Sequence, residues 1–183
     1  MKKITLLSFI LTLIATPAIA EGMYVGVKLG QANYDFSNVT NNDQAAFGFL
    51  AGFNVNEHAI VEVEYDNLGG FDTDPGTAVT SNGNVTGSAF SLSGIGLLPL
   101  NRQLSLFGKL GMSSTTLTNQ PKPGFTGNDI VSSNLALNFG MGIQYNISPY
   151  VGVRAGLDSF EVGNASVGTD KARMLYMGAI FKM

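Results

Sequence analysis

The sequence predicts an all-β fold, an eight-stranded antiparallel up-and-down barrel whose strands cross a membrane. Three observations carry this prediction. The chain repeats stretches in which apolar residues alternate with small or polar ones, and the connections between these stretches alternate between long and short. Charged residues make up only 13% of the 183 residues, against about 25% in a typical soluble domain. Because so small a chain has a large surface, the low charge indicates that part of this surface avoids water.

The first 20 residues have the layout of a secretory signal peptide. A short basic start is followed by an apolar run over 4–15, and an Ala-x-Ala motif ends at Ala20, directly before Glu21. The alternative, an N-terminal anchor helix, is disfavoured because the apolar run is too short to span a bilayer. We therefore expect cleavage between Ala20 and Glu21, removal of 1–20, and one barrel domain over 21–183.

The composition of the remaining chain excludes several classes of protein. Without Lys2 and Lys3, eight basic residues face thirteen acidic ones, a net charge of −5, so we expect no nucleic acid partner. The absence of cysteine excludes a disulfide framework and a thiol catalyst. No later segment has about 18 consecutive apolar residues, so helical spans are excluded and a closed barrel is the remaining way to cross lipid.

Eight alternating stretches follow one another along the chain. They cover residues 23–33, 45–55, 59–67, 87–98, 104–113, 135–146, 150–158 and 172–183. Alternation over about ten residues is typical of a transmembrane strand, and the signal adds up over eight stretches.

Each stretch opposes two kinds of side chain. The first sets valines and a leucine against glycines and Lys28, the second gathers phenylalanines on one face, and the third sets valines against three carboxylates. The fourth alternates at first but loses the pattern over 94–97, so its register is left open. The fifth opposes leucines to Lys109, the sixth alternates without a break, the seventh opposes valines to Arg154, and the eighth alternates up to Met183.

The connections have the lengths of an outer membrane barrel. Residues 56–58, 99–103 and 146–149 are short, and the longer segments are rich in Asn, Asp, Gly, Ser and Thr: 34–44, 68–86, 114–130 and 159–171. Such barrels have short periplasmic turns and longer extracellular loops. With both termini in the periplasm, the observed order of long and short connections fits eight strands without adjustment.

The charged residues within the stretches fall on one face. Seven of eight share the small and polar face: Lys28, Glu62, Glu64, Asp66, Lys109, Arg154 and Lys182. The eighth, Arg173, lies at the outer end of the last strand, where a long side chain reaches the interface. A mid-membrane charge facing lipid costs about 2–4 kcal/mol, so the distribution is what lipid requires. The alternative, a soluble β-sandwich or lipocalin-like barrel, would place Lys, Glu and Thr on the outer face.

The end of the chain carries the most specific motif. Tyr176, Gly178, Phe181 and Met183 resemble the terminal signal that the outer-membrane assembly machinery reads, although most bacterial examples end in Phe rather than Met.

Residues 24–30, 104–111 and 151–156 resemble strands of the OmpA-like, opacity-type barrel family, and this resemblance covers essentially the whole mature chain. It implies residence in the outer membrane lipid and the assembly machinery as a partner. Some members add a periplasmic peptidoglycan-binding domain after the barrel. We expect none here, because the sequence ends at the eighth strand.

The resemblance also implies a network of ion pairs inside the barrel. Its candidate members are the inward charges Lys28, Glu62, Glu64, Asp66, Lys109 and Arg154. Unpaired charges in a dry interior are costly, so we expect these groups to pair and plug the lumen. The alternative is an ion path or gate, which is disfavoured because the side chains of an eight-stranded barrel nearly fill it.

The sequence offers no catalytic residue, cofactor or metal site. Lipid-modifying barrels need a histidine beside a serine near the outer leaflet, whereas His58, the one histidine, falls in a predicted periplasmic turn. Asp72 and Asp74 lack the spacing of a calcium loop, so we expect no bound calcium there.

The predicted function is therefore structural or surface-interacting. We expect a monomer that supports envelope integrity and contacts a host or surface ligand through its long loops, since function concentrates in loops on a rigid scaffold. Tyr34, Phe36, Phe71 and Phe125 could make such contacts or belong to the upper aromatic girdle. The first alternative is a narrow porin-like channel, and the second, disfavoured, is a lipid-modifying enzyme.

Overall fold

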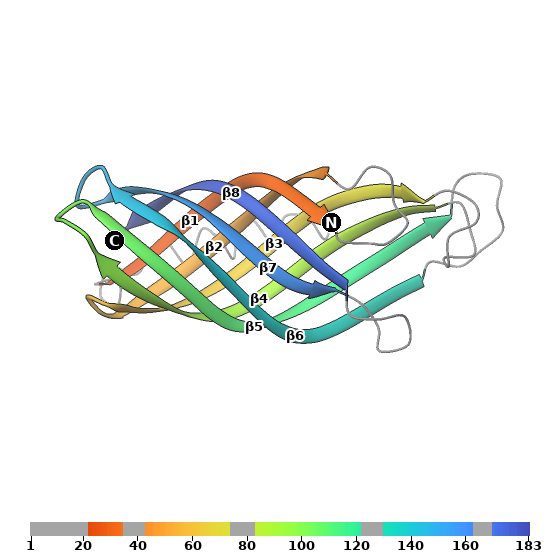
Figure 1. Cartoon of the computed structure of the whole chain (residues 1–183), viewed down its shortest axis with the longest axis horizontal. Coiled ribbons are helices and arrows are strands. Elements are labelled where there is room, and N and C mark those ends of the chain that lie inside the picture. Colours follow the sequence, from red (N-terminus) through yellow and green to blue (C-terminus); the bar gives the residue numbers. More distant parts are fainter. Residues whose placement is uncertain (1–21, 35–42, 74–82, 122–129, 163–169) are drawn as a thin grey trace, which may run out of the picture.

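The alternating stretches form eight strands, each paired antiparallel with the next and the last with the first. The computed structural model describes residues 22–34, 43–73, 83–121, 130–162 and 170–183. The strands are β1 Met23–Tyr34, β2 Asp43–Asn56, β3 Ala59–Thr73, β4 Gly83–Pro99, β5 Leu104–Pro121, β6 Ile130–Asn146, β7 Val151–Val162 and β8 Asp170–Lys182. Figure 1 shows them as one closed barrel, which confirms the predicted fold class. These residues include no apolar helix of membrane-spanning length.

The register of the ladders determines how wide the barrel is. One path of directly paired residues runs once around it, through Tyr24, Gly52, Glu62, Ser93, Gly111, Asn138, Phe160, Ala172 and Tyr34. It returns to β1 ten residues beyond its start, and this stagger tilts the strands by about 40° to the barrel axis. With eight strands, the interior is just wide enough for side chains to fill it.

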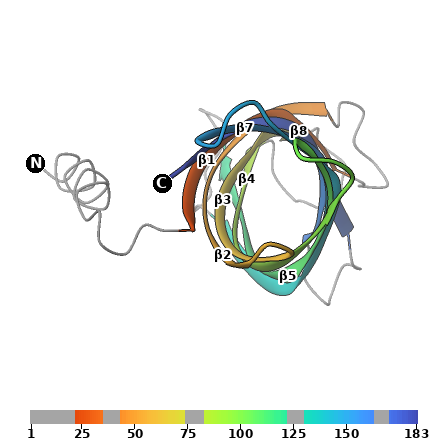
Figure 2. The same cartoon turned by 90° about the vertical axis from the view of Figure 1, so that its left-hand side faces the viewer.

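The start of β1 and the end of β8 lie at the same end of the barrel as the three short turns. The amide of Met183 donates a hydrogen bond to the carbonyl of Met23 over 2.9 Å, so the first and last strands meet there. The turns at 57–58, 100–103 and 147–150 lie at the same end, which Figure 2 views. Asn101 stabilises its turn by accepting hydrogen bonds from the amides of Gln103 and Leu104 at 2.9 and 2.8 Å. By the usual topology of outer membrane barrels, this end faces the periplasm.

The outer face of the barrel is apolar and the inner face holds the charges. Large apolar side chains point outward from every strand, among them Leu29, Phe49, Val61, Leu92, Leu110, Met141, Leu157 and Met177. Leu110 is 63% exposed and Met177 71%, whereas Lys28 and Arg154 are buried. This inverted arrangement suits lipid outside and a packed polar interior.

The fourth strand keeps its alternation where the sequence pattern seemed to break. Ser93 and Ile95 point inward, while Gly94 and Gly96 point outward. A Cβ built on Gly96 would meet no atom within 4 Å. The pattern is obscured because here the small residues face outward and the aliphatic ones face the lumen.

The strands run further toward the long connections than the sequence predicts. The predicted ends of β3 and β5 are residues 67 and 113, but the ladders continue to Thr73 and Pro121. Phe71 pairs with Val85 and so belongs to a strand, as does Tyr34. Above the membrane both strand faces can be polar, so the alternation that marks a strand is lost. Phe36, Asp74 and Phe125 lie outside the described residues.

Candidate functional site

Inward side chains divide the lumen into layers, and β3 shows their order. From the periplasmic end, its inward residues are Ile60, Glu62, Glu64, Asp66 and Leu68, all of them buried. An apolar position thus comes first, then three charges, then a second apolar position. The strands β1, β7 and β8 follow the same order, with charged or tyrosine side chains below small or apolar ones.

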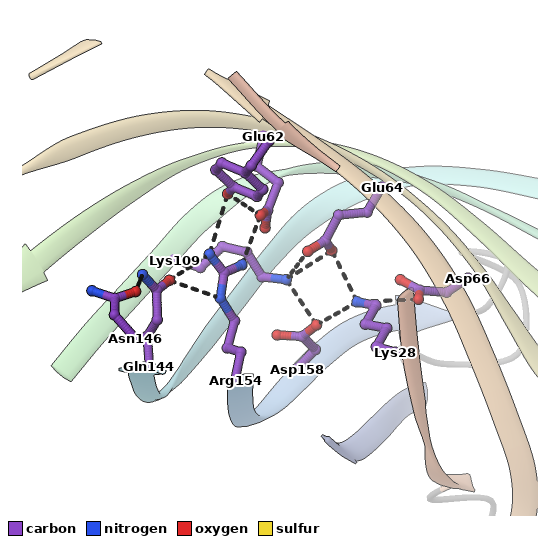
Figure 3. Close-up of polar contacts among 10 residues, drawn as sticks. Lys28, Glu62, Glu64, Asp66, Lys109, Gln144, Asn146, Arg154 and Asp158 are labelled. Atoms are coloured by element: carbon purple, nitrogen blue, oxygen red, sulfur yellow. Dashed lines mark hydrogen bonds and ion pairs between the residues drawn. The ribbon is translucent and has the colours of Figure 1, made fainter. Parts of the chain in front are cut away.

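Arg154 is the centre of the charged layer nearest the periplasm. Its Nη1 donates to Oε2 of Glu62 at 2.7 Å, its Nη2 donates to Oε1 of Gln144 at 2.9 Å, and its Nη2 also donates to the Tyr24 hydroxyl at 3.2 Å. Tyr24 donates in turn to the same oxygen of Glu62. The guanidinium also lies 5.1 Å from the centre of the Phe107 ring, within cation–π range. Figure 3 shows Arg154, Glu62 and Gln144 converging from different strands.

Two lysines and two carboxylates form the next layer. Lys109 Nζ lies 2.8 Å from Oε2 of Glu64 and 2.7 Å from Oδ2 of Asp158. Lys28 Nζ lies 3.1 Å from the same Glu64 oxygen and 2.9 Å from the same Asp158 oxygen. Each carboxylate therefore bridges two ammonium groups, as the dashed lines in Figure 3 indicate. Lys28 also lies 3.1 Å from Oδ1 of Asp66.

Lys28 occupies the position in which a metal ion would otherwise be expected. Oxygens of Glu64, Asp66 and Asp158 lie within 4.8 Å of one another, close enough for shared coordination. The Lys28 ammonium contacts one oxygen of each of these three carboxylates at 2.9–3.1 Å. Lys28 and Lys109 thus place two protein cations against these three carboxylates, and the Lys28 ammonium lies where a shared ion would bind.

Apolar side chains close the lumen above the ionic layer. Leu68, Phe160 and Met174 are each 0% exposed. Four buried alanines complete this layer: Ala32, Ala46, Ala89 and Ala172. Together with the Arg154 layer below, they enclose the ion pairs on both sides.

Inward glycines make room for the charged side chains. A Cβ on Gly140 would collide with Oδ1 of Asp158, and a Cβ on Gly48 would collide with Oδ1 of Asp66. Both glycines are buried on the inner face. The glycine content of the inner face therefore follows from the bulk of the ionic network in a narrow barrel.

The structure places all six predicted lumen residues in this network, together with members that are not among the predicted ones. Asp158 bridges both lysines; it ends the predicted seventh stretch and has the parity of Arg154, which is the signal that places it inward. Tyr24 and Phe107 also point inward. The alternation along their strands is enough to place both residues inward. The sequence, however, predicts an inner face of small or polar residues and no aromatic rings there.

The remaining predicted positions have different surroundings. Tyr176 points into the lumen, where Lys28 Nζ lies 4.7 Å from its ring centre, whereas Phe181 and Met183 are exposed on the outside. A Cβ on Gly178 would lie 3.2 Å from Cβ of Lys28, so this glycine borders the network. The reading of this motif by the assembly machinery stays a prediction. The predicted cleavage site, Ala20 and Glu21, lies outside the described residues.

His58 lies in the turn between β2 and β3, at the periplasmic end as expected. Its side chain is 59% exposed, and its Nδ1 is 3.8 Å from a carboxylate oxygen of Glu57.

Solved structures with the same architecture are numerous but distant in sequence. Neisserial surface protein A superposes with a TM-score of 0.71 at 16% identity, covering 89% of this chain and 98% of that one. Ail, the attachment invasion locus protein of Yersinia pestis, in complex with the heparin analogue sucrose octasulfate, gives 0.58 at 16% identity, covering 88% and 96%. The N-terminal β-barrel domain of Pseudomonas aeruginosa OprF gives 0.54 at 17% identity, covering 88% and 98%. No curated protein sequence matches significantly.

At these identities the structural similarities show the fold. The family is shown by the sequence itself, because residues 4–179 match the outer membrane protein beta-barrel domain. The chain therefore belongs to the outer membrane protein beta-barrel family and resides in the outer membrane.

Proposed function

We propose that this protein is a closed, non-enzymatic membrane anchor that presents a rigid four-stranded sheet at the cell surface for contact with another protein. The observation that carries the proposal is the unequal length of the strands. Figure 1 shows β3, β4, β5 and β6 running well past the ends of β1, β7 and β8 on the side of the long connections.

The projecting sheet is long enough to stand clear of the membrane. On β5 the last strongly exposed apolar residue is Met112, and the strand continues to Pro121. At about 3.3 Å per residue and a tilt of about 40°, residues 114–121 add roughly 20 Å of height. The outward residues Thr116 and Thr118 of β5 are polar, and the hydroxyls of Thr116 and Ser133 lie 3.1 Å apart across β5 and β6.

Within the described ladders both edges of this sheet are open: residues 70–73 of β3 pair with β4 alone, and the longer open edge is that of β6. The pairing of β6 with β7 begins at Asn138 with Phe160, whereas residues 130–137 pair with β5 alone. An open edge presents backbone N–H and C=O groups that accept a further strand. Addition of an extended strand is a common mode of protein recognition, so the occupant that we propose is an exposed strand of a partner protein at the cell surface.

The filled lumen supports an anchor rather than a channel. A solute would have to cross the Arg154 layer, the paired lysines and carboxylates, and the apolar layer around Phe160. Breaking buried ion pairs to admit it is costly. The position of His58 in a periplasmic turn likewise supports a protein without lipid-modifying activity, since the outer leaflet lies at the opposite end.

One structural neighbour, Ail, is named the attachment invasion locus protein, and this name supports a contact role. The partner proposed for this chain rests on its own open edge.

Proline substitution on the edge tests the proposal. Backbone N–H groups along a strand point alternately to its two sides. Ser133→Pro and Asn134→Pro change adjacent positions, so one of them removes an N–H group from the open edge and the other breaks a hydrogen bond to β5. Heat-modifiable gel mobility identifies the variant that keeps the folded barrel. Bacteria displaying wild type, this variant or no barrel are then compared for adherence to epithelial cells.

Wild type is expected to raise adherence over cells without the barrel, and the folded edge variant to lose most of that gain. The control variant is Ser114→Lys, which changes the outward face of the same sheet and leaves the backbone of the open edge intact. A proline there would not be a control, because β5 is paired on both sides. Bacteria with Ser114→Lys should adhere like wild type. Adherence of wild type at the level of cells without the barrel contradicts a contact role. Unchanged adherence of the folded proline variant contradicts the edge as its site.

A further inference from the structure

The periplasmic mouth of the barrel contains a cavity of about 410 Å³. Its apolar floor is formed by Tyr24, Ile60, Leu97 and Ile180, and amide side chains line its walls. This volume falls in the range of small-ligand pockets. A second cavity of about 310 Å³ adjoins it between the turns at 100–103 and 147–150.

The cavity is blind. Tyr24 accepts a hydrogen bond from Arg154, Ile60 is the inward residue before Glu62 on β3, and both are buried. A molecule that enters from the periplasm meets these residues and the ion pairs above them. The cavity therefore suits docking of a ligand rather than its passage.

Two cations are shared by the two cavities. Arg102 comes from the turn between β4 and β5, and Lys182 ends β8; both line both cavities, together with Asn146. Among the described residues that line the two cavities, Glu57 is the one acidic residue; its side chain is 87% exposed and lies 3.8 Å from Nδ1 of His58. The charged side chains among these lining residues therefore sum to an excess of one positive charge.

Lys182 is half-buried and keeps donor capacity for a ligand. Its Nζ donates to Oδ1 of Asn146 over 2.8 Å. No carboxylate pairs with it among the ion pairs of the described residues. An ammonium group carries three donors, and a neutral amide oxygen leaves its charge unmatched. The guanidinium of Arg102 is exposed and adds a planar fork of donors.

We propose that the periplasmic mouth is a binding site for a phosphate group, held by Lys182 and Arg102 with hydrogen bonds from the surrounding amides. Phosphate carries up to two negative charges and several acceptor oxygens, which matches two cations beside amide donors better than a carboxylate does. The group could belong to a soluble periplasmic molecule or to the headgroup of an inner-leaflet phospholipid. The chemistry of recognition is the same in both cases.

A titration with inorganic phosphate tests the site. The protein is held in micelles of an alkyl maltoside, which contain no phosphate, at constant ionic strength, and the side-chain amide signals of Gln144 and Asn146 are followed by NMR up to about 20 mM phosphate. Saturable shifts of both amides are expected. Lys182→Gln and Arg102→Gln should each raise the dissociation constant about fivefold or more, as expected for loss of one charge-assisted contact.

Lys171→Gln is the matched control. This exposed lysine lies on β8 at the opposite end of the barrel, so its removal should leave the titration unchanged. Shifts that are absent, that rise without saturation, or that are equal in wild type and the Lys182 variant would overturn the site. Gel mobility of each variant verifies that the barrel is folded.

A second experiment distinguishes the two sources of phosphate. Phosphatidylglycerol is added to the same micelles, and free phosphate is omitted. If the same amides shift and added phosphate then has no further effect, a lipid headgroup fills the site. If they shift with free phosphate alone, the ligand is a soluble molecule. If neither source shifts them, the proposal is wrong, whereas the proposed surface function is untouched.

Discussion

Replacing Arg154 with methionine removes the cation of the lower lumen layer while keeping a long side chain there. The substitution breaks the 2.7 Å ion pair with Glu62 and the bonds to Gln144 and Tyr24. Glu62 is 0% exposed, so its carboxylate stays buried without a cationic partner. Breaking a buried pair in this way costs about 3–5 kcal/mol. Since stabilities are typically about 5–15 kcal/mol, the loss is a large share of the whole.

The prediction is measured by reversible urea unfolding of the barrel in lipid vesicles. Arg154→Met should lower the free energy of unfolding by about 3–5 kcal/mol. The double variant Arg154→Met with Glu62→Gln removes both charges and keeps an amide beside Tyr24, so it should recover about 2 kcal/mol of that loss. A loss below about 1 kcal/mol, which is typical of an exposed pair, would refute the reasoning. So would a double variant no more stable than the single one.

Further predictions concern the two faces of the wall. Gly140→Ala should destabilise the barrel by about 1–3 kcal/mol in the same unfolding assay, because the new methyl collides with Asp158. Gly108→Ala, which meets nothing within 4 Å, should change it little, and equal effects would contradict the crowded lumen. Leu110→Arg should cost about 2–4 kcal/mol in lipid, whereas Thr116→Arg, in the projecting sheet, should cost about 0–1 kcal/mol. Equal losses of stability in these two variants would contradict a membrane boundary between Leu110 and Thr116.

The sequence predicts the wall of the barrel better than its contents. Strand order, the lipid face and the inward position of Lys28, Lys109 and Arg154 all follow from period-two alternation, because lipid admits only one kind of residue on the outside. The upper ends of β3 and β5 escape prediction because water reaches both faces above the membrane. The alternation of apolar and polar residues therefore does not predict the projecting sheet, on which the proposed function rests.

The partners within the lumen cannot be obtained from any single strand. Lys28 meets Asp158 across 130 positions of the chain, a contact that depends on the stagger of the whole closed ladder. Alternation places both residues inward but not at the same height. Aromatic rings such as Tyr24 and Phe107 reach the interior because an inner face needs volume as well as polarity, and only the closed geometry shows how much.

The central claim, that ion pairs and apolar side chains close the lumen, is tested most directly by conductance. Purified wild-type protein is inserted into a planar lipid bilayer and recorded at about 100 mV, with heat-modifiable gel mobility verifying the folded state. A closed barrel predicts a baseline without steady single-channel openings. Large, steady openings of the folded wild-type protein would contradict the closed lumen and favour a narrow channel.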